Sequence, residues 1–412
     1  MKKHLKLLST ATALLLTVAM LAGCGSKEVE QAADTAKEAA AAAEEAVEDV
    51  VDGDTINVGA LYNLTGGQAS LDQPSFNGFK LAADQINANG GINGKMINVV
   101  SYDCKTDQTT SANNAKKMID VDGCVVLAGF SDSNYALAAG NICQEAGVPF
   151  IASGATLPTL PDLIGDMAFL APFGDNIQAY ACADFLTNDL NVTKAYLLTD
   201  QSMEFTTTLA KFFKEKFEAN GGEIVLEDNY MNKDPDFSAQ IDRFLAEGAD
   251  AEAIFIAGVP DDAGVVVKQF RDKGVDLPII SGDGFDTPLL IEVAGEGANQ
   301  TYVATHASME NTDPVMVDFI AAYKEAYGTD PENAFAGLGY DTMYLIADAL
   351  TRAESLDGTA IRDAIAATSG LKGVTGTVTY ENGSHVPTKS VTINVVEDGA
   401  FKFVKEVTPS TN

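Results

Sequence analysis

Hydroxyl side chains follow two of the strands that the sequence predicts. Ser131 comes after the predicted strand 124–128, and Thr156 closes the run Ser153-Gly154-Ala155-Thr156. Backbone N–H groups at a turn from a strand into a helix bind anions readily. Serine and threonine are also the usual residues that cap helices. The residues alone therefore leave both interpretations open, an anion site and ordinary helix capping.

A single carboxylate stands out later in the chain. Asp283 lies between Gly282 and Gly284, directly after the predicted strand 278–281. Open α/β folds bind ligands outside the carboxyl ends of their strands, so this position suits a ligand contact. An aspartate that merely stabilises a turn is the alternative.

The common catalytic arrangements are missing from this sequence. His306 and His385 are far apart and belong to no H-E-x-x-H motif or His/Cys pairing. The run 129–133 lacks the last glycine of a nucleophile elbow. Asp261 and Asp262 fit the first turn of a helix better than an acid/base pair. We therefore expect no catalytic residues, no metal site and no cofactor, and a hydrolase is disfavoured.

Four cysteines follow Cys24 in the chain, and we expect all of them to be buried thiols. Cys104 ends one predicted strand and Cys124 begins the next, which places them at opposite edges of a parallel sheet, too far apart for a disulfide. Cys143, on a returning helix, could approach Cys124, so that pairing stays open. Cys182 completes the set.

The elements that would position these side chains alternate between strands and helices. The first predicted strands are 56–62, 97–102, 124–128 and 149–152. A second series comprises 195–199, 223–227, 253–256 and 278–281, separated by helices 205–220, 237–247 and 261–273. Helices 315–327, 334–353 and 359–367 and short β segments near 378, 391–395 and 401–404 complete the chain. This rhythm predicts an α/β protein with two doubly wound parallel sheets.

The first residues have the organisation of an export signal. Lysines 2, 3 and 6 precede an uncharged run, 7–23, that ends in Leu21-Ala22-Gly23-Cys24. The run is shorter than the roughly 20 apolar residues that span a bilayer, which disfavours a transmembrane anchor. Its ending resembles the lipobox of bacterial lipoproteins, so residues 1–23 are predicted to be a signal peptide and Cys24 the lipidated residue.

Charge divides the remaining chain into a tether and a body. Residues 24–54 hold two lysines and ten acids in an alanine-rich sequence without an apolar stripe, which predicts a solvated tether rather than a partner-binding helix. The whole chain of 412 residues carries a formal charge of -33. Such a balance excludes a nucleic-acid binder and excludes docking of the bare protein on anionic lipid.

Several motifs in the body resemble the leucine/isoleucine/valine-binding proteins, a family of type 1 periplasmic binding proteins. They are Val58-Gly59-Ala60-Leu61, Phe76-Asn77-Gly78, the run Asn87-Ala88-Asn89-Gly90-Gly91-Ile92-Asn93-Gly94 and Tyr102-Asp103. The similarity covers residues 55–407. It implies two α/β lobes joined by a three-strand hinge, with crossings near Pro172, Thr305 and Pro387. The first lobe would be 55–172 plus 306–387, and the second 173–305 plus 388–407.

The resemblance also assigns roles at the polar end of a ligand. Ser131 and Thr156 match the positions that hold a ligand carboxylate. Asp283 matches the acidic residue that pairs with a ligand ammonium group, where well-known members have glutamate. The carbonyl of Gly154 would be a further ammonium acceptor.

At the apolar end, this sequence departs from the family pattern. Phe205 and Val259 stand where the family has pocket tyrosines, and Leu71, Phe130 and Tyr62 fall where side-chain pocket residues would lie. Any of these five could equally belong to the core. The two departures remove hydroxyl groups, which implies a more apolar pocket.

Taken with the signal, the resemblance implies a monomeric solute-binding lipoprotein of an ABC importer. It would be anchored on the extracytoplasmic face of the cell membrane, and would carry a small hydrophobic or branched-chain amino acid to permease and ATPase subunits. Binding proteins for amides, urea or aromatic acids, and a ligand-sensing receptor of the same fold, are the alternatives.

Overall fold

The computed structural model of the protein describes residues 55–408. The predicted signal 1–23, the lipidation site Cys24 and the tether 24–54 lie outside the described residues. Within residues 55–408, no helix combines the length and the apolar character that crossing a membrane requires.

The first half of the described chain forms a five-stranded sheet with the order β2-β1-β3-β4-β5. Its strands are β1 (Thr55–Tyr62), β2 (Met96–Asp103), β3 (Val126–Gly129), β4 (Phe150–Ala152) and β5 (Ala168–Leu170). The helices between them are α3 (Ala69–Ala88), α4 (Gln108–Asp120), α5 (Ser133–Ala146) and α6 (Leu160–Ile164). The pairs β1–β3, β3–β4 and β4–β5 are all parallel.

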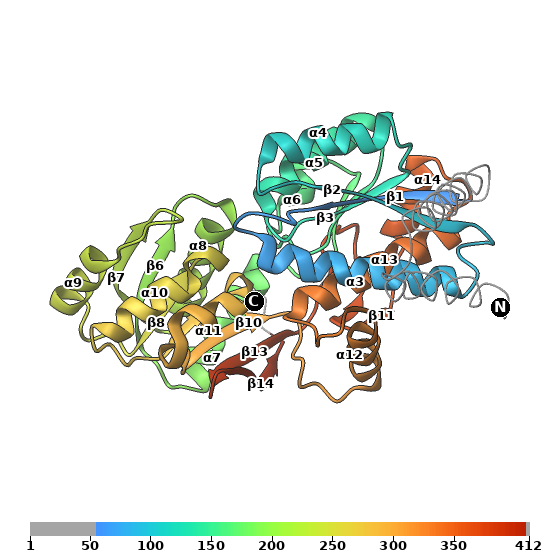
Figure 1. Cartoon of the computed structure of the whole chain (residues 1–412). Coiled ribbons are helices and arrows are strands. Elements are labelled where there is room, and N and C mark those ends of the chain that lie inside the picture. Colours follow the sequence, from blue (N-terminus) through green and yellow to red (C-terminus); the bar gives the residue numbers. More distant parts are fainter. Residues whose placement is uncertain (1–54, 409–412) are drawn as a thin grey trace, which may run out of the picture. The chain divides into compact units, whose positions relative to one another are not determined.

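A seven-stranded sheet follows, with the order β14-β13-β10-β9-β8-β6-β7. Its strands are β6 (Lys194–Asp200), β7 (Glu223–Tyr230), β8 (Ala253–Ala257), β9 (Ile279–Ser281), β10 (Thr301–Thr305), β13 (Val391–Glu397) and β14 (Ala400–Val407). The helical segments of this part are α7 (Asp175–Asn188), α8 (Glu204–Ala219), α9 (Ser238–Glu247), α10 (Pro260–Asp272), η1 (Asp283–Phe285), α11 (Pro288–Ala294) and η2 (Gly295–Ala298). Figure 1 shows the two sheets with their own sets of helices.

The predicted α/β class with parallel sheets is confirmed, with one refinement in the second sheet. Strands β6 to β10 are parallel, whereas β13 runs antiparallel to both β10 and β14. β13 and β14 form a hairpin, because only Asp398 and Gly399 separate them, and a hairpin pairs its strands in opposite directions.

The last third of the chain returns to the first sheet before it enters the second. Its elements are α12 (Pro314–Tyr327), α13 (Ala334–Arg352), α14 (Gly358–Ala366), β11 (Leu371–Gly373) and β12 (Gly376–Val378). α13 packs along α3. A Cβ atom on Gly78 of α3 would lie 1.9 Å from the carbonyl oxygen of Ala336 on α13. Glycine therefore permits these two backbones to touch.

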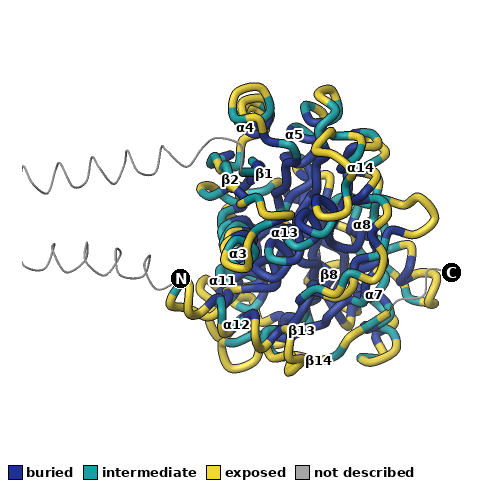
Figure 2. Tube along the Cα trace, turned by 90° about the vertical axis from the view of Figure 1, so that its right-hand side faces the viewer, coloured by how far each residue is buried: buried dark blue, intermediate teal, exposed yellow. Residues whose placement is uncertain are grey.

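Alternation along the strands divides the core between the two faces of each sheet. In β1 and β3, Leu61 and Leu127 pack with α4 and α5, whereas Val58 and Val126 pack with α3 and α13. The same alternation in β6 and β8 separates the α7–α8 side from the α9–α10 side. Figure 2 shows the buried strands, β8 among them, enclosed by helices with exposed outer faces. Successive side chains of a strand point to opposite faces of the sheet, so both faces are apolar and both are covered by helices.

The four predicted thiols are all found in the described part of the chain. Cys104, Cys124, Cys143 and Cys182 are buried and form no disulfide in the structure. Burial raises the pKa of each thiol, to about 12 for Cys104 and Cys124, so these groups stay protonated and unreactive.

Candidate ligand-binding site

A small cavity lies among loops and helix starts that follow strands of both sheets. Its volume is about 10 Å³, which is room for about one water molecule. Residues from both halves of the fold contribute to its lining, which consists of Gln68, Leu71, Ser131, Asp132, Phe205, Val259, Pro260, Asp283, Gly284 and Phe335. Five of the nine residues that the sequence predicted for ligand binding meet here: Leu71, Ser131, Phe205, Val259 and Asp283.

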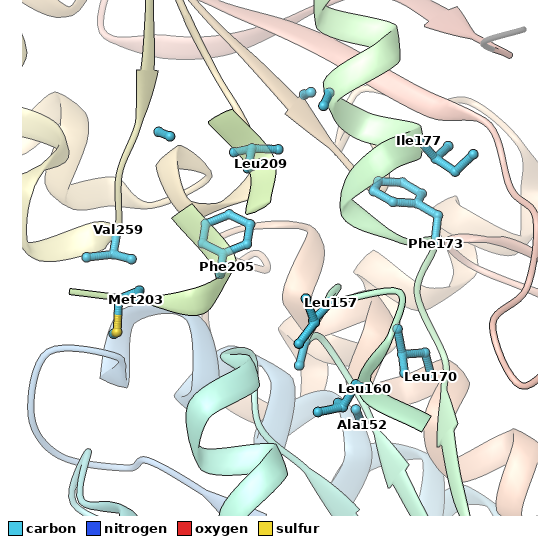
Figure 3. Packing of buried hydrophobic residues seen from close by; sticks show 14 of the residues in the cluster. Ala152, Leu157, Leu160, Leu170, Phe173, Ile177, Met203, Phe205, Leu209 and Val259 are labelled. Carbon is cyan, nitrogen blue, oxygen red and sulfur yellow. The ribbon is translucent and has the colours of Figure 1, made fainter. Parts of the chain in front are cut away.

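The apolar side of this cavity combines residues from both sheets. Leu71 of α3 and Phe335 of α13 form a small cluster of their own with Leu338. Phe205 and Val259 approach from the α8 and α10 side and belong to the largest apolar cluster. Figure 3 shows Phe205, Met203 and Val259 near one another, with Leu157 in the same apolar cluster. A ligand that enters here would bury an apolar side chain among these residues.

Ser131 sits on a loop with unusual backbone geometry. Gly129 ends β3 with φ 151°, and a Cβ atom there would lie 1.7 Å from the carbonyl oxygen of Leu61. Phe130 follows with φ 61°, in the left-handed region that is rare for a bulky residue. Strained backbone of this kind clusters at ligand-binding sites. The turn carries Ser131 away from the strand and into the cavity lining.

The carboxylate of Asp72 holds this loop in place. It accepts hydrogen bonds from the backbone N–H groups of Asn63 and Ser131, both at 2.7 Å. Because Asp72 is buried, its pKa is raised to about 6. The N–H of Ser131 is thereby used within the protein, and its buried Oγ is also close enough to this carboxylate to lower the pKa of Asp72.

Gly154 and Thr156 border the cavity without lining it. A Cβ atom on Gly154 would lie 2.9 Å from the ring of Phe335 and 3.0 Å from Oγ of Ser131. Thr156 connects to Asp283 through Gln178 of α7. The Gln178 amide donates to Oγ1 of Thr156 at 3.4 Å, and its oxygen accepts from the backbone N–H of Asp283 at 2.9 Å.

Phe130 and Tyr62 lie elsewhere, in the core of the first sheet. Phe130 packs against Tyr135 and Phe150, with ring centroids 6.3 and 6.4 Å apart. Tyr62 packs against Phe76 and Phe79. Both are fully buried and absent from the cavity lining.

Asp283 has a partner that the sequence did not predict. Its Oδ2 lies 2.8 Å from Nε2 of His306, and both side chains are almost completely buried. The pairing follows from the sheet, because β9 and β10 are parallel neighbours with Ser281 opposite Val303. Residues that follow these strands therefore emerge side by side.

Further carboxylates surround the site, and they are close enough to influence one another. Burial raises the pKa of Asp132 to about 7 and that of Asp175 well above its ordinary value, and the charge of Asp283 adds to both shifts. Oδ2 of Asp175 has no hydrogen-bond partner among the described residues. A positively charged group placed here would favour the ionised forms of these carboxyl groups. No cluster of three or more metal-binding side chains occurs within residues 55–408.

Three larger crevices lie outside this arrangement. The smallest of them, of about 180 Å³, lies beside Tyr340 and Leu371, and the other two have similar volumes. One, of about 470 Å³, is lined by His306, Thr375 and Lys389, among others. The other, of about 480 Å³, lies beside Pro158 and His385. None of the three gathers side chains from the carboxyl ends of both parallel sheets, where α/β proteins hold their ligands. The small cavity therefore remains the candidate site.

Two α/β halves with a mixed polar and apolar site between them define a two-lobed binding protein. The chain belongs to the periplasmic binding protein family, whose pattern matches residues 55–400. Its family is one of solute-binding proteins, and the resemblance predicted from the sequence is confirmed.

Similar proteins include binders of different small molecules. An amino acid binding protein of Pseudomonas aeruginosa is 27% identical over 76% of this chain and 82% of its own length. The branched-chain amino acid transporter substrate-binding protein LivJ of Streptococcus pneumoniae, solved with isoleucine, is 30% identical, with a TM-score of 0.80 over 86% of this chain and all of LivJ. A solute-binding protein of Rhodopseudomonas palustris, solved with 3,4-dihydroxybenzoic acid, is 27% identical, with a TM-score of 0.76 over 86% of this chain and 97% of its own.

Proposed function

We propose that this protein captures a small hydrophobic or branched-chain amino acid between its two lobes and delivers it to an ABC importer. The observation that carries the proposal is the composition of the small cavity. The Asp283 carboxylate and the Ser131 hydroxyl line the same cavity as Leu71, Phe205 and Val259. An α-amino acid with an apolar side chain presents the matching groups.

Asp283 would pair with the ammonium group of the ligand. A bound ammonium group would also favour the ionised forms of the nearby Asp132 and Asp175, whose pKa values burial raises. The hydroxyls of Ser131 and Thr156 would hold the ligand carboxylate, and the carbonyl of Gly154 would add an ammonium contact. The relative that binds isoleucine supports this class of ligand.

Binding would require the lobes to open. A cavity of about 10 Å³ is far smaller than the 300 Å³ or more that is usual for ligand pockets. We propose lobes of residues 55–172 plus 306–387 and of residues 173–305 plus 388–407, with hinges near Pro172, Thr305 and Pro387. Rotation about these crossings would admit the ligand, and the closed form would be recognised by the permease.

The protein would act as a lipid-anchored monomer on the extracytoplasmic face of the membrane. Cys24 would carry the lipid, and residues 24–54 would hold the lobes away from an anionic surface. A single acyl chain binds a membrane only marginally, so stable anchoring needs more than one chain. ATP hydrolysis would belong to the partner subunits of the importer.

A binding protein for aromatic acids is the second candidate, because one similar structure holds 3,4-dihydroxybenzoic acid. Asp283 argues against it, since a ligand without an amino group would place its own carboxylate near that of Asp283 with no cation between them. A buried charge without an opposite charge beside it destabilises the complex.

A thermal-shift screen tests the proposal and separates the two candidates. Bound ligand raises the apparent melting temperature by mass action. We expect leucine, isoleucine, valine or phenylalanine to raise it, and 3,4-dihydroxybenzoate to leave it unchanged. A shift with the aromatic acid alone would favour the second candidate and refute the first.

A further inference from the structure

His306 is held rigidly beside the carboxylate that the proposed ligand would contact. Its ring stacks on Phe173, with centroids 4.2 Å apart and planes inclined by 28°, and meets the ring of Phe335 edge-on at 5.7 Å. The side chain has no exposed surface, and its Nε2 lies 2.8 Å from Oδ2 of Asp283. The ring therefore has a fixed plane and a fixed partner.

The geometry assigns the tautomer. A carboxylate oxygen only accepts hydrogen bonds, so Nε2 must carry the proton that bridges to Asp283. Nδ1, also buried, has no partner among the described residues. Burial lowers the pKa of His306 below its ordinary 6.5, and the neutral ring is therefore the form present near pH 7. The bond occupies Oδ2 and leaves Oδ1 for a cationic ligand.

Other charges face this pair from several elements. Lys389, before β13, lies close enough for its charge to lower the pKa of His306. Asp132 at the start of α5, Asp175 of α7 and Asp286 after η1 all interact electrostatically with Asp283. Titration of these groups also changes the ligand affinity with pH, so a test of His306 needs a control in which they are all present.

We propose that neutral His306 is a positioning residue that aims the Asp283 carboxylate at the ammonium group of the ligand, and that protonation of His306 drives the ligand off. The inference rests on the proposed function. A protonated ring would place a second cation on the carboxylate that the ammonium group needs. Ligand binding and proton binding at His306 are therefore mutually unfavourable, and the coupling is reciprocal.

The consequence is a loss of affinity in acid. One proton taken up on ligand release lowers the affinity by up to about tenfold for each pH unit below the pKa of the free site. Because burial lowers the pKa of His306, this loss begins below pH 6.5. The protein would capture its ligand well near neutral pH and poorly in acid surroundings.

Calorimetric titration of the full-length protein with leucine, near pH 8 and near pH 5, tests the inference. His306→Gln is the matched variant, because the Gln amide donates a similar hydrogen bond but does not titrate. The quantity compared is the ratio of the affinities near pH 8 and near pH 5 within each protein, so a change in absolute affinity caused by the substitution cancels. Wild type should lose more affinity than His306→Gln as the pH falls through the pKa of His306.

Asp132, Asp175, Asp286 and Lys389 are present in both proteins, so the difference between the two pH profiles isolates His306. An equal loss in wild type and His306→Gln would overturn the inference. A thermal melt of each protein at both pH values confirms that the folded state is being compared.

Nitrogen-15 NMR of the imidazole rings gives a readout that needs no ligand. His306 should show the neutral form with the proton on Nε2. In wild type the Asp283 carboxylate favours the charged ring, so Asp283→Asn should lower the pKa of His306 further. An unchanged His306 titration in Asp283→Asn would contradict the pairing. If wild type bound no amino acid at any pH, the proposed function would fail, while this titration would still decide whether His306 is coupled to Asp283.

Discussion

The carboxylate of Asp72 on α3 accepts a hydrogen bond at 2.7 Å from the backbone N–H of Ser131, in the loop after β3. Its other oxygen accepts from the N–H of Asn63, so one side chain fixes both strand ends. The loop that carries Ser131, the proposed ligand contact, is therefore held by a residue that does not line the cavity.

Asp72→Ala should weaken both folding and ligand binding. The substitution leaves two buried N–H groups without acceptors, and we expect a loss of about 2–5 kcal/mol in the free energy of unfolding. Denaturant titration measures this loss. Asp120→Asn is the control, because Asp120 forms only an exposed ion pair with Lys116, and its removal should cost less than about 1 kcal/mol. Equal effects of the two substitutions would refute the role of Asp72.

The protein should be more stable in mild acid than at neutral pH. Burial raises the pKa of Asp72 and Asp286 to about 6 and of Asp132 to about 7. For these groups the pKa is higher in the folded protein than in the unfolded chain. The resulting stabilisation is complete at a pH below the pKa of the unfolded chain. It is lost as the pH rises through the pKa of the folded protein. For Asp72 and Asp286, this stabilisation amounts to up to about 3 kcal/mol each in the free energy of unfolding, and it is lost between pH 3.8 and about 6.

Melting temperatures near pH 5 and pH 7.5 measure this effect. We expect the higher value near pH 5, because the buried carboxyl groups with raised pKa values outweigh His306, whose lowered pKa opposes them below pH 6.5. Asp132→Asn should flatten the profile. A melting temperature that falls steadily from pH 7.5 to pH 5 would show that these carboxyl groups stay ionised in the fold.

Close packing of α3 on α13 makes Gly339 intolerant of a side chain. A Cβ atom there would lie 1.8 Å from the carbonyl oxygen of Ser75, so Gly339→Ala must push the helices apart. We expect a destabilisation of roughly 1–3 kcal/mol or more, measured by denaturant unfolding. Gly297→Ala is the matched control, since its nearest neighbour is the flexible side chain of Arg271, at 3.3 Å. If Gly339→Ala were as stable as Gly297→Ala, the helices would not be in backbone contact.

Lipid attachment can be tested separately from ligand binding. Metabolic labelling of expressing cells with a fatty acid should mark the wild-type protein and leave Cys24→Ala unmarked. Cys104→Ala is the control, because it removes a buried thiol and should leave the label in place. Label retained in Cys24→Ala would exclude that residue as the anchor.

Much of the fold could be predicted from periodicity, because strands buried on both faces are nearly continuous apolar runs. β3 and β8, for example, are buried at every position and were predicted within two residues. β5 was missed, since Ala168–Leu170 is only three residues long and no pattern repeats over that length. The direction of β13 was missed too, because alternation is the same in parallel and antiparallel strands.

The site was predicted in part for a similar reason. Ser131 and Asp283 follow strands, and strand ends are where such folds place ligands. His306 was overlooked because its partner is 23 residues away in sequence and becomes adjacent only through the pairing of β9 with β10. Phe335 gave no signal, since an aromatic residue at the start of a helix is usually core.

Calorimetry with leucine and with 4-methylpentanoate, which is leucine without its amino group, tests the central claim most directly. We expect saturable binding of leucine or of another hydrophobic amino acid. We also expect the acid lacking the amino group to bind at least about a hundredfold more weakly, because Asp283 is left without its cation. Asp283→Asn should remove most of that difference. Binding of 4-methylpentanoate within a few-fold of leucine would contradict the claim that Asp283 recognises an ammonium group.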